Sequence, residues 1–239
     1  MNEIEVLIAS TQFANYAEEI SFQMEESAKA RGTGIAKRPP EYLVQKMEEG
    51  KAIIALTTEG EWVGFCYIET WQHGKFVANS GLIVHPKFRN SGVAKTIKAK
   101  AFELSRNKYP EAKIIGITTS LAVMKINSEL GYEPTTFSEL PVDDAFWKGC
   151  KSCVNYDVLT RTERKHCLCT GMIYKPEWEK KKIEKEITQK KEEIELLEEA
   201  EDHEKWNFLK DLKVVERLKN IKEKIFLKIS PFTSSGAIN

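Results

Sequence analysis

The chain has 239 residues, enough for one domain of ordinary size with an extension. Its 36 Lys and Arg balance its 36 Asp and Glu, so overall charge gives no reason to expect nucleic acid or an anionic membrane as the partner. No signal peptide and no apolar run of about 18 residues is visible, which predicts a cytoplasmic protein. Its five cysteines are then expected as reduced thiols or metal ligands.

The part of the chain before Pro176 alternates apolar and polar stretches, which predicts mixed strands and helices. Strands are expected at residues 4–8, 52–57, 63–71, 76–84, 113–118 and 133–137. Helices are expected at residues 13–30 (with Thr11 as a cap), 40–48, 91–107 and 121–130. Residues 154–159 and 167–174 are predicted to be the two arms of a final hairpin.

An anion site is predicted where the strand at residues 76–84 leads into the next helix. The first turn of a helix has unpaired N–H groups and a partial positive charge, and a glycine there lets the backbone approach a ligand closely. A pyrophosphate fits such a site. The residues expected to bind it are Arg89, Asn90, Ser91, Gly92, Val93, Ala94 and Lys95.

This turn resembles motif A of the GNAT superfamily of acyltransferases, in which Arg or Gln is followed three residues later by Gly and five residues later by Gly or Ala. The segment from Ser120 to Tyr132 resembles the family's motif B helix, with Gly131 expected just past the helix end at positive φ. The resemblance implies an α+β fold (a mixed α/β sheet of the GNAT acyltransferase type). Its central strands would splay apart near Val84 and Thr118.

The resemblance also implies acetyl-CoA as the acyl donor, with succinyl-CoA left open. The pantetheine arm would lie between the splayed strands and bond to the backbone of Leu82, Ile83 and Val84. The pyrophosphate would sit on the N–H groups of residues 90–95.

Two positions depart from the family pattern. Asn127 stands where many members have a Tyr that protonates the leaving thiolate; an amide cannot do this, but it can hydrogen-bond the sulfur or the thioester oxygen. The strand before motif A carries no Glu, and Glu69 on the preceding strand is the nearest acidic candidate. The expected catalytic residues are therefore Glu69, Ser80 and Asn127, with a solvated strand residue as the alternative for Glu69.

The acceptor is expected near the segment joining the first two helices, which carries Arg31, Lys37 and Arg38. Arginine can hold a carboxylate through two N–H groups, and a solvated basic loop is the alternative. Trp71 is expected to line the acceptor site. Together with residues 147–157, this segment resembles stand-alone GNAT proteins that acylate glutamate at the start of arginine synthesis, which implies a role in amino-acid biosynthesis.

Four cysteines, at positions 150, 153, 167 and 169, have a spacing in which four thiolates would satisfy tetrahedral zinc. In the predicted hairpin, however, Cys153 lies opposite a residue near Met172 rather than opposite Cys167 or Cys169. The sequence therefore favours buried or pocket-lining thiols and no metal, with zinc as the alternative.

Domain boundaries are predicted by the change of composition at Pro176. Residues 1–175 form the expected acyltransferase domain, residues 176–229 a charged helical extension and residues 230–239 a flexible tail. Residues 176–204 hold 12 acidic and 6 basic side chains, whereas residues 205–228 hold 3 and 8. Each half also has a predicted apolar seam, formed by Ile183, Ile187, Ile194 and Leu197 in the first half and by Phe208, Leu212, Val215, Leu218 and Ile225 in the second. Opposite charge favours antiparallel pairing of the two halves, either as a helical hairpin with a turn near residues 202–203 or as a coiled-coil homodimer. A solvated charged helix without a partner is the alternative.

The sequence thus predicts an N-acyltransferase that moves an acyl group from acyl-CoA to a small amine, such as the amino group of glutamate. Neither nucleic acid nor a membrane is expected as a partner. Two alternatives are a non-catalytic CoA-binding regulatory or scaffold protein and a protein N-acetyltransferase.

Overall fold

The computed structural model describes residues 3–32, 38–201 and 219–223 of the chain. The chain divides into two compact units, Met1–Trp178 and Glu179–Asn239. The predicted domain boundaries at residues 175 and 229 stay predictions.

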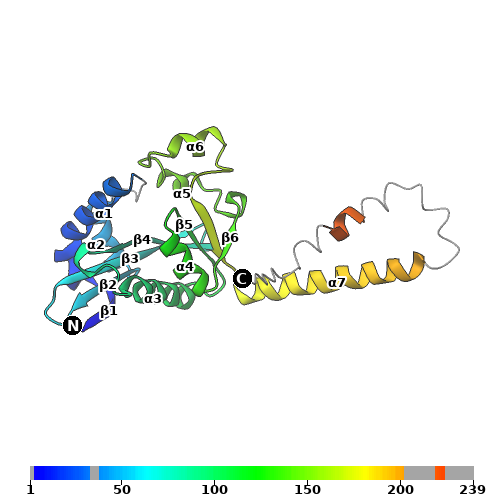
Figure 1. Cartoon of the computed structure of the whole chain (residues 1–239). Helices are drawn as coiled ribbons and strands as arrows, with labels where there is room; N and C mark the ends of the chain where they lie inside the picture. Colours follow the sequence, from blue (N-terminus) through cyan, green and yellow to red (C-terminus); the bar gives the residue numbers. More distant parts are fainter. Residues whose placement is uncertain (1–2, 33–37, 202–218, 224–239) are drawn as a thin grey trace, which may run out of the picture. The chain divides into compact units, whose positions relative to one another are not determined.

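Seven strands of the first unit form one sheet in the order β1-β2-β3-β4-β5-β7-β6 (Figure 1). Neighbouring strands are antiparallel, except that β4 and β5 run parallel. This mixed sheet confirms the predicted fold class. The strands are β1 (Ile4–Ala9), β2 (Ala52–Thr57), β3 (Trp62–Trp71), β4 (Phe76–Val84), β5 (Lys113–Thr118), β6 (Glu133–Thr135) and β7 (Thr170–Tyr174).

Helices cover both faces of the sheet, because alternate side chains of a strand point to opposite faces. Phe65 and Tyr67 of β3 pack in one core cluster with α1 (Ala17–Arg31) and α2 (Pro40–Glu48). Cys66 of β3 packs in a second cluster with α3 (Val93–Lys108). The other helix of this second face is α4 (Leu121–Glu129), which lies beside α3 in Figure 1.

Most predicted elements agree with the structure to within two residues. The first helix differs, since residues Thr11–Tyr16 form a 3-10 helix (η1) and Thr11 makes no cap. Gly131 follows α4 at a φ of 85°, which confirms the predicted glycine stop. Two further 3-10 turns, η2 (Pro86–Phe88) and η3 (Phe137–Glu139), lie in loops.

The predicted final hairpin is wrong. Residues 154–159 are not a strand; the segment between β6 and β7 instead contains α5 (Asp144–Lys148) and α6 (Tyr156–Arg161). Both edges of β7 are occupied, one by β5 and the other by β6, so no edge is left for a hairpin arm. The segment buries Trp147 and Leu159 against Ile115 and Ile173 instead.

The sheet opens between its two parallel strands. β4 pairs with β5 only through Phe76–Ala78 and Lys113–Ile115, although β4 continues to Val84 and β5 to Thr118. The remainder of β4 stays paired to β3, and the remainder of β5 stays paired to β7. The predicted splaying of the central strands is therefore confirmed, and we call this region the β4–β5 divergence.

A long helix, α7 (Glu177–Glu201), confirms the first part of the predicted charged extension. Ile183 and Ile187 on its predicted apolar seam are half-buried. The predicted turn near residues 202–203 and the seam residues Phe208, Leu212, Val215, Leu218 and Ile225 lie outside the described residues. None of the helices in the described part of the chain is long and apolar enough to cross a membrane.

Candidate functional site

Residues predicted to be catalytic lie around the β4–β5 divergence. Glu69 is opposite Ala78, the last residue of β4 that pairs with β5, and Ser80 is two residues further along β4. Asn127 of α4 packs against Gly116, the first β5 residue beyond the pairing; its amide nitrogen lies 3.3 Å from where a Cβ would stand there. Glu69 faces the side covered by α1 and α2, whereas Asn127 faces the side covered by α4, so the three residues approach the divergence from both faces.

The Glu69 carboxylate is held by residues from two other elements. The Tyr42 hydroxyl of α2 donates a hydrogen bond to it, and the Arg38 guanidinium lies 4.0 Å away. Arg38 also donates through Nε to the Tyr67 hydroxyl at 2.7 Å and stacks over the Tyr42 ring, 5.3 Å from its centroid. The 4.0 Å separation is too long for a direct hydrogen bond, so Arg38 and Glu69 keep bonding capacity for a ligand.

Burial and the neighbouring Glu69 carboxylate raise the pKa of the Tyr42 hydroxyl far above its usual range, and burial raises that of Tyr67. Both phenols therefore stay protonated at neutral pH. A protonated Tyr42 can only support Glu69 as a hydrogen-bond donor, which makes Tyr42 a positioning residue for the carboxylate.

Trp71 lies at the end of β3, on the same face as Glu69. Its ring packs edge-on against Phe146 of α5 at 5.5 Å, and its indole N–H is buried with no hydrogen-bond partner among the residues that the structure describes. The same segment reaches Arg38, since the guanidinium is 3.8 Å from where a Cβ would stand at Gly149. An unpaired buried donor and a guanidinium thus lie on the side where the acceptor is expected.

A buried polar network lies on the opposite face of the sheet. The Asn79 side chain of β4 donates to Ser105 of α3 at 2.7 Å and accepts from the Tyr132 hydroxyl at 2.9 Å. Asn127 is 1% exposed; its Nδ2 contacts the Met172 sulfur at 3.6 Å, and its Oδ1 has no partner in the described ranges of the chain. The unpaired Oδ1 is an acceptor that a ligand N–H could satisfy.

The predicted anion site is the start of α3. Gly92 is the N-cap with a φ of 85°, and a Cβ there would meet nothing within 4 Å, so the backbone conformation rather than crowding requires a glycine. Arg89 is turned back toward the core, donating to the Val84 carbonyl at 3.2 Å and to the Ser27 hydroxyl at 3.0 Å. The Lys95 N–H donates to the Gly92 carbonyl, and its ammonium pairs with Glu129 at 2.8 Å.

The other residues predicted to bind the donor lie on β4, in the turn before α3 and at the start of α3. Ser91 donates to the Phe88 carbonyl at 2.6 Å, and Asn90 has a positive φ of 64°. Val93 is the first residue of α3. Beyond the divergence, Ile83 and Val84 pair with β3 through one strand edge, and β5 does not pair with their other edge.

Two residues predicted to bind the acceptor cannot be placed, and one residue observed at the site was not predicted. Lys37 lies outside the described residues, and the side chain of Arg31 is likewise not described. Sequence analysis missed Tyr42, because its contact with Glu69 depends on how α2 packs on the sheet. No local pattern in the sequence signals that contact.

The four cysteines come close together, although the predicted hairpin had separated them. Burial and the neighbouring thiols of Cys167, Cys153 and Cys150 raise the pKa of Cys169 to about 12. Burial and the neighbouring thiols of Cys167 and Cys153 raise the pKa of Cys150 to about 11. As the side chains stand, no three His, Cys, Asp or Glu groups in the described ranges are arranged to hold a metal ion.

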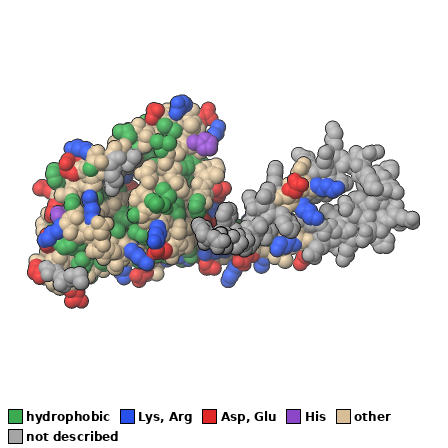
Figure 2. All heavy atoms as spheres, viewed as in Figure 1, with side chains coloured by type: hydrophobic (Ala, Val, Ile, Leu, Met, Phe, Trp, Pro, Cys, Tyr) green, Lys and Arg blue, Asp and Glu red, His purple; other side chains and the backbone are tan. Residues whose placement is uncertain are grey.

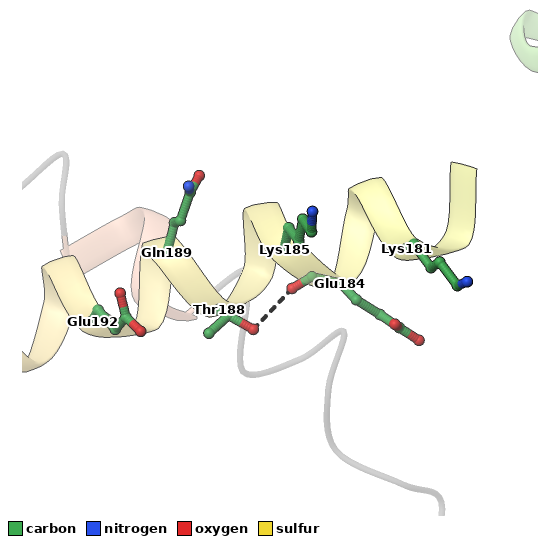
Figure 3. Close-up of a pocket in the computed structure, with 6 residues that line it drawn as sticks. All are labelled: Lys181, Glu184, Lys185, Thr188, Gln189 and Glu192. Atoms are coloured by element: carbon green, nitrogen blue, oxygen red, sulfur yellow. Dashed lines mark hydrogen bonds between the residues drawn. The ribbon is translucent and has the colours of Figure 1, made fainter. Parts of the chain in front are cut away.

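Neither the surface charge nor a hollow along α7 indicates a second binding site. On the face shown in Figure 2, basic and acidic side chains are interspersed, without a large patch of one sign. A hollow along α7 is lined by Lys181, Glu184, Lys185, Thr188, Gln189 and Glu192, with Thr188 donating to the Glu184 carbonyl at 2.9 Å (Figure 3). These lining side chains are all polar and come from one helix, and none is among the predicted site residues.

Residues 21–124 match the model of the acetyltransferase (GNAT) family. The match includes Arg38, Glu69, the β4–β5 divergence and the start of α3. A search of curated proteins finds no match to this chain.

Solved structures share the fold at low sequence identity. N-acetylglutamate synthase from Neisseria gonorrhoeae, complexed with coenzyme A and N-acetyl-glutamate, has a TM-score of 0.52 and 14% identity over 72% of this chain. The match covers 35% of the synthase, so this chain corresponds to about a third of its length.

Two smaller proteins match over nearly their whole length. Rv2747 from Mycobacterium tuberculosis, in complex with CoA, has a TM-score of 0.50 and 13% identity over 71% of this chain and 97% of its own. The yncA protein from Salmonella typhimurium, with acetyl-CoA, has a TM-score of 0.50 and 11% identity over 72% and 94%.

Proposed function

We propose that the GNAT acetyltransferase domain carried by this chain moves an acetyl group from acetyl-CoA to the amino group of an amino acid such as glutamate. The observation that carries the proposal is the loosely paired Arg38 and Glu69 beside the β4–β5 divergence. An amino acid presents a carboxylate, which a guanidinium recognises, and an amine, which must lose a proton to a base when it is acylated.

The residues present fit acetyl-CoA as the donor. The start of α3 offers backbone N–H groups and a glycine turn for the pyrophosphate, and β4 beyond Ala78 offers a strand edge that β5 does not use. The solved neighbours that contain CoA or acetyl-CoA support this choice. Succinyl-CoA remains the alternative donor.

Direct attack on the thioester needs few groups from the protein. The amine nitrogen bonds to the thioester carbon, the carbon–sulfur bond breaks, and the thiolate takes a proton from water. We assign the ammonium proton to Glu69, directly or through a water on Ser80, and the oxyanion to the backbone N–H near Ile83 or Val84. Asn127 cannot supply the thiolate's proton, but its amide can hydrogen-bond the sulfur or the thioester oxygen.

Acceptor recognition is assigned to Arg38 and Trp71. Arg38 would hold one carboxylate, and the unpaired indole N–H of Trp71 offers a further donor on the same face. A dicarboxylic amino acid uses more of these donors than a simple amine does. Arg31 and Lys37 remain candidates for binding the second carboxylate. Acetylation of glutamate would give the protein a role in amino-acid biosynthesis in the cytoplasm.

The test is mass-spectrometric detection of acylated product with acetyl-CoA or succinyl-CoA and a panel of free amino acids headed by glutamate. Acetylated glutamate is the expected product. Acylation of a peptide alone would indicate a protein N-acetyltransferase. Binding of acetyl-CoA without any product would favour the non-catalytic sensor.

The Arg38→Ala variant, measured in the same assay, tests whether Arg38 recognises the carboxylate of the acceptor. Loss of a charged hydrogen bond to the acceptor should raise the KM for glutamate at least about tenfold. The KM for an amine without a carboxylate should stay the same. If both acceptors respond equally, Arg38 has a structural role and the assignment is wrong.

A further inference from the structure

Lys98 is a buried lysine that pairs with no carboxylate among the described residues. The residue is 2% exposed, although it lies on α3, whose Lys95 and Lys100 side chains are in solvent. No hydrogen bond or ion pair joins its ammonium to another residue within the described ranges. A buried charge of this kind is costly to keep, which is why fully buried lysines are rare unless a partner is present.

The position of Lys98 is defined by Cys66 and Tyr132. Its ammonium lies over the Tyr132 ring, 5.4 Å from the centroid, and is in electrostatic contact with the Cys66 thiol. The Tyr132 hydroxyl bonds to Asn79 at 2.9 Å, and the Cys66 thiol bonds to the Ser80 carbonyl at 3.3 Å. Asn79 and Ser80 are the first two residues of β4 beyond the pairing with β5, so Lys98 lies at the β4–β5 divergence.

Neither neighbour can supply the missing negative charge near neutral pH. Burial raises the pKa of the Cys66 thiol to about 11 and raises that of the Tyr132 hydroxyl well above its usual range. Both groups are therefore uncharged. Burial lowers the pKa of Lys98 itself to about 8, so at pH 7 most molecules still carry the unpaired ammonium.

A second unsatisfied group lies close by. Tyr132 donates its backbone N–H to the carbonyl of Asn127, and the Oδ1 of the Asn127 side chain is buried without a partner. Lys98 thus offers a donor and Asn127 an acceptor on the same face of the sheet, and both residues contact Tyr132. An amide group, which has one carbonyl oxygen and one N–H, satisfies this combination.

We propose that Lys98 binds the pantetheine arm of the acyl donor by donating a hydrogen bond to an amide carbonyl of the arm, and that Asn127 accepts from an amide N–H. This inference rests on the proposed function. The pyrophosphate site at the start of α3 is five residues from Lys98, or about 7.5 Å along the helix axis. An arm that runs from that site to the β4–β5 divergence reaches the part of the sheet beside which Lys98 and Asn127 lie.

The test compares Lys98→Met with Lys100→Met by calorimetric titration of the full chain. Lys100 is on the same helix, and its ammonium pairs in solvent with Glu103 at 3.0 Å, so it makes a matched control. Lys98→Met should weaken acetyl-CoA binding at least about tenfold, the usual weight of a charged hydrogen bond. Lys100→Met should leave the affinity unchanged.

Adenosine 3′,5′-bisphosphate, which has the nucleotide end but no arm, separates arm binding from a general effect. Lys98→Met should leave its affinity unchanged. The melting temperature of the ligand-free variant should equal or exceed that of the wild type, because a methionine removes an uncompensated buried charge. A lower melting temperature with equal weakening of both ligands would show a structural role and overturn the inference.

The pH dependence gives an independent readout. A hydrogen bond to the ammonium raises the Lys98 pKa in the complex, so acetyl-CoA affinity should fall as pH rises above about 8 in the wild type and not in Lys98→Met. Two titratable groups face Lys98: the Cys66 thiol, whose pKa burial raises to about 11, and the Tyr132 hydroxyl, whose pKa burial raises well above its usual range. If the wild type binds no acetyl-CoA, the proposed function fails. If the wild type and Lys98→Met bind it equally, only the Lys98 inference fails.

Discussion

Glu69 lies on β3 with its carboxylate bonded by Tyr42 and faced by Arg38, on the side of the sheet where the acceptor is expected. Glu69→Gln keeps an oxygen that can accept from Tyr42 but cannot take a proton. We expect kcat/KM for the amine to fall about 10²- to 10⁴-fold at neutral pH, the usual contribution of a general base. The loss should shrink at high pH, where the free amine is already deprotonated.

Initial rates across the pH range, with acetyl-CoA affinity measured in parallel, check this expectation. Affinity for acetyl-CoA should not change, since Glu69 is on the acceptor side. Glu61→Gln is the control, because Glu61 lies outside the site and pairs with Lys87 in solvent at 2.7 Å. A rate loss that stays the same at every pH would point to positioning rather than proton transfer.

Cys150, Cys153, Cys167 and Cys169 are close enough to influence one another electrostatically. As the side chains stand, however, no three His, Cys, Asp or Glu groups in the described part of the chain are arranged to hold a metal ion. We expect elemental analysis of untagged protein to find far less than one zinc per chain. Stoichiometric zinc, lost together with stability on chelation, would contradict this.

At the scale of single elements, the start of α3 and the end of α4 provide a matched pair of glycines. Gly92 and Gly131 both have a φ of 85°, and a Cβ would meet nothing within 4 Å at Gly92 and only the Tyr174 ring at 3.5 Å at Gly131. Substitution by alanine should therefore cost about 1 kcal/mol of unfolding free energy at either position, from left-handed backbone strain alone.

The two variants should differ in ligand binding. Gly92→Ala should also weaken acetyl-CoA, because the turn at Gly92 presents the first N–H groups of α3, whereas Gly131→Ala should not. Urea unfolding and ligand titration on both variants make the comparison. Equal affinities for acetyl-CoA would remove the start of α3 from the donor site.

At the scale of the whole molecule, the charged extension is the part whose role the sequence leaves open. Trp178 bonds to the Glu111 carbonyl of the first unit, at 3.4 Å, so a truncation after Trp178 keeps that contact. We propose a homodimer through the extension, because its two halves carry opposite charge. Light scattering should show a dimer for the full chain and a monomer for the truncated chain, and the same oligomeric state for both would contradict the dimer.

The sequence by itself determined the elements whose causes are local. Short apolar runs predicted β2, β4 and β5, a proline at the first position predicted the start of α2, and Gly131 predicted the end of α4. The turn at Gly92 was recognisable because its positive φ and the helix that follows are encoded within a few residues. The family resemblance added the divergence of β4 and β5, which pairing in the structure confirms.

Only the tertiary structure decided the features that depend on segments far apart in the chain. Residues 154–159 could not be assigned correctly, because β5 and β6 occupy both edges of β7 and leave no edge for a hairpin arm. Tyr42 meets Glu69 through the packing of α2 on the sheet, and Lys98 is buried beside Cys66 and Tyr132. Contacts between distant segments leave no periodic or local signal, so the sequence supplies the side chains and packing decides which of them meet.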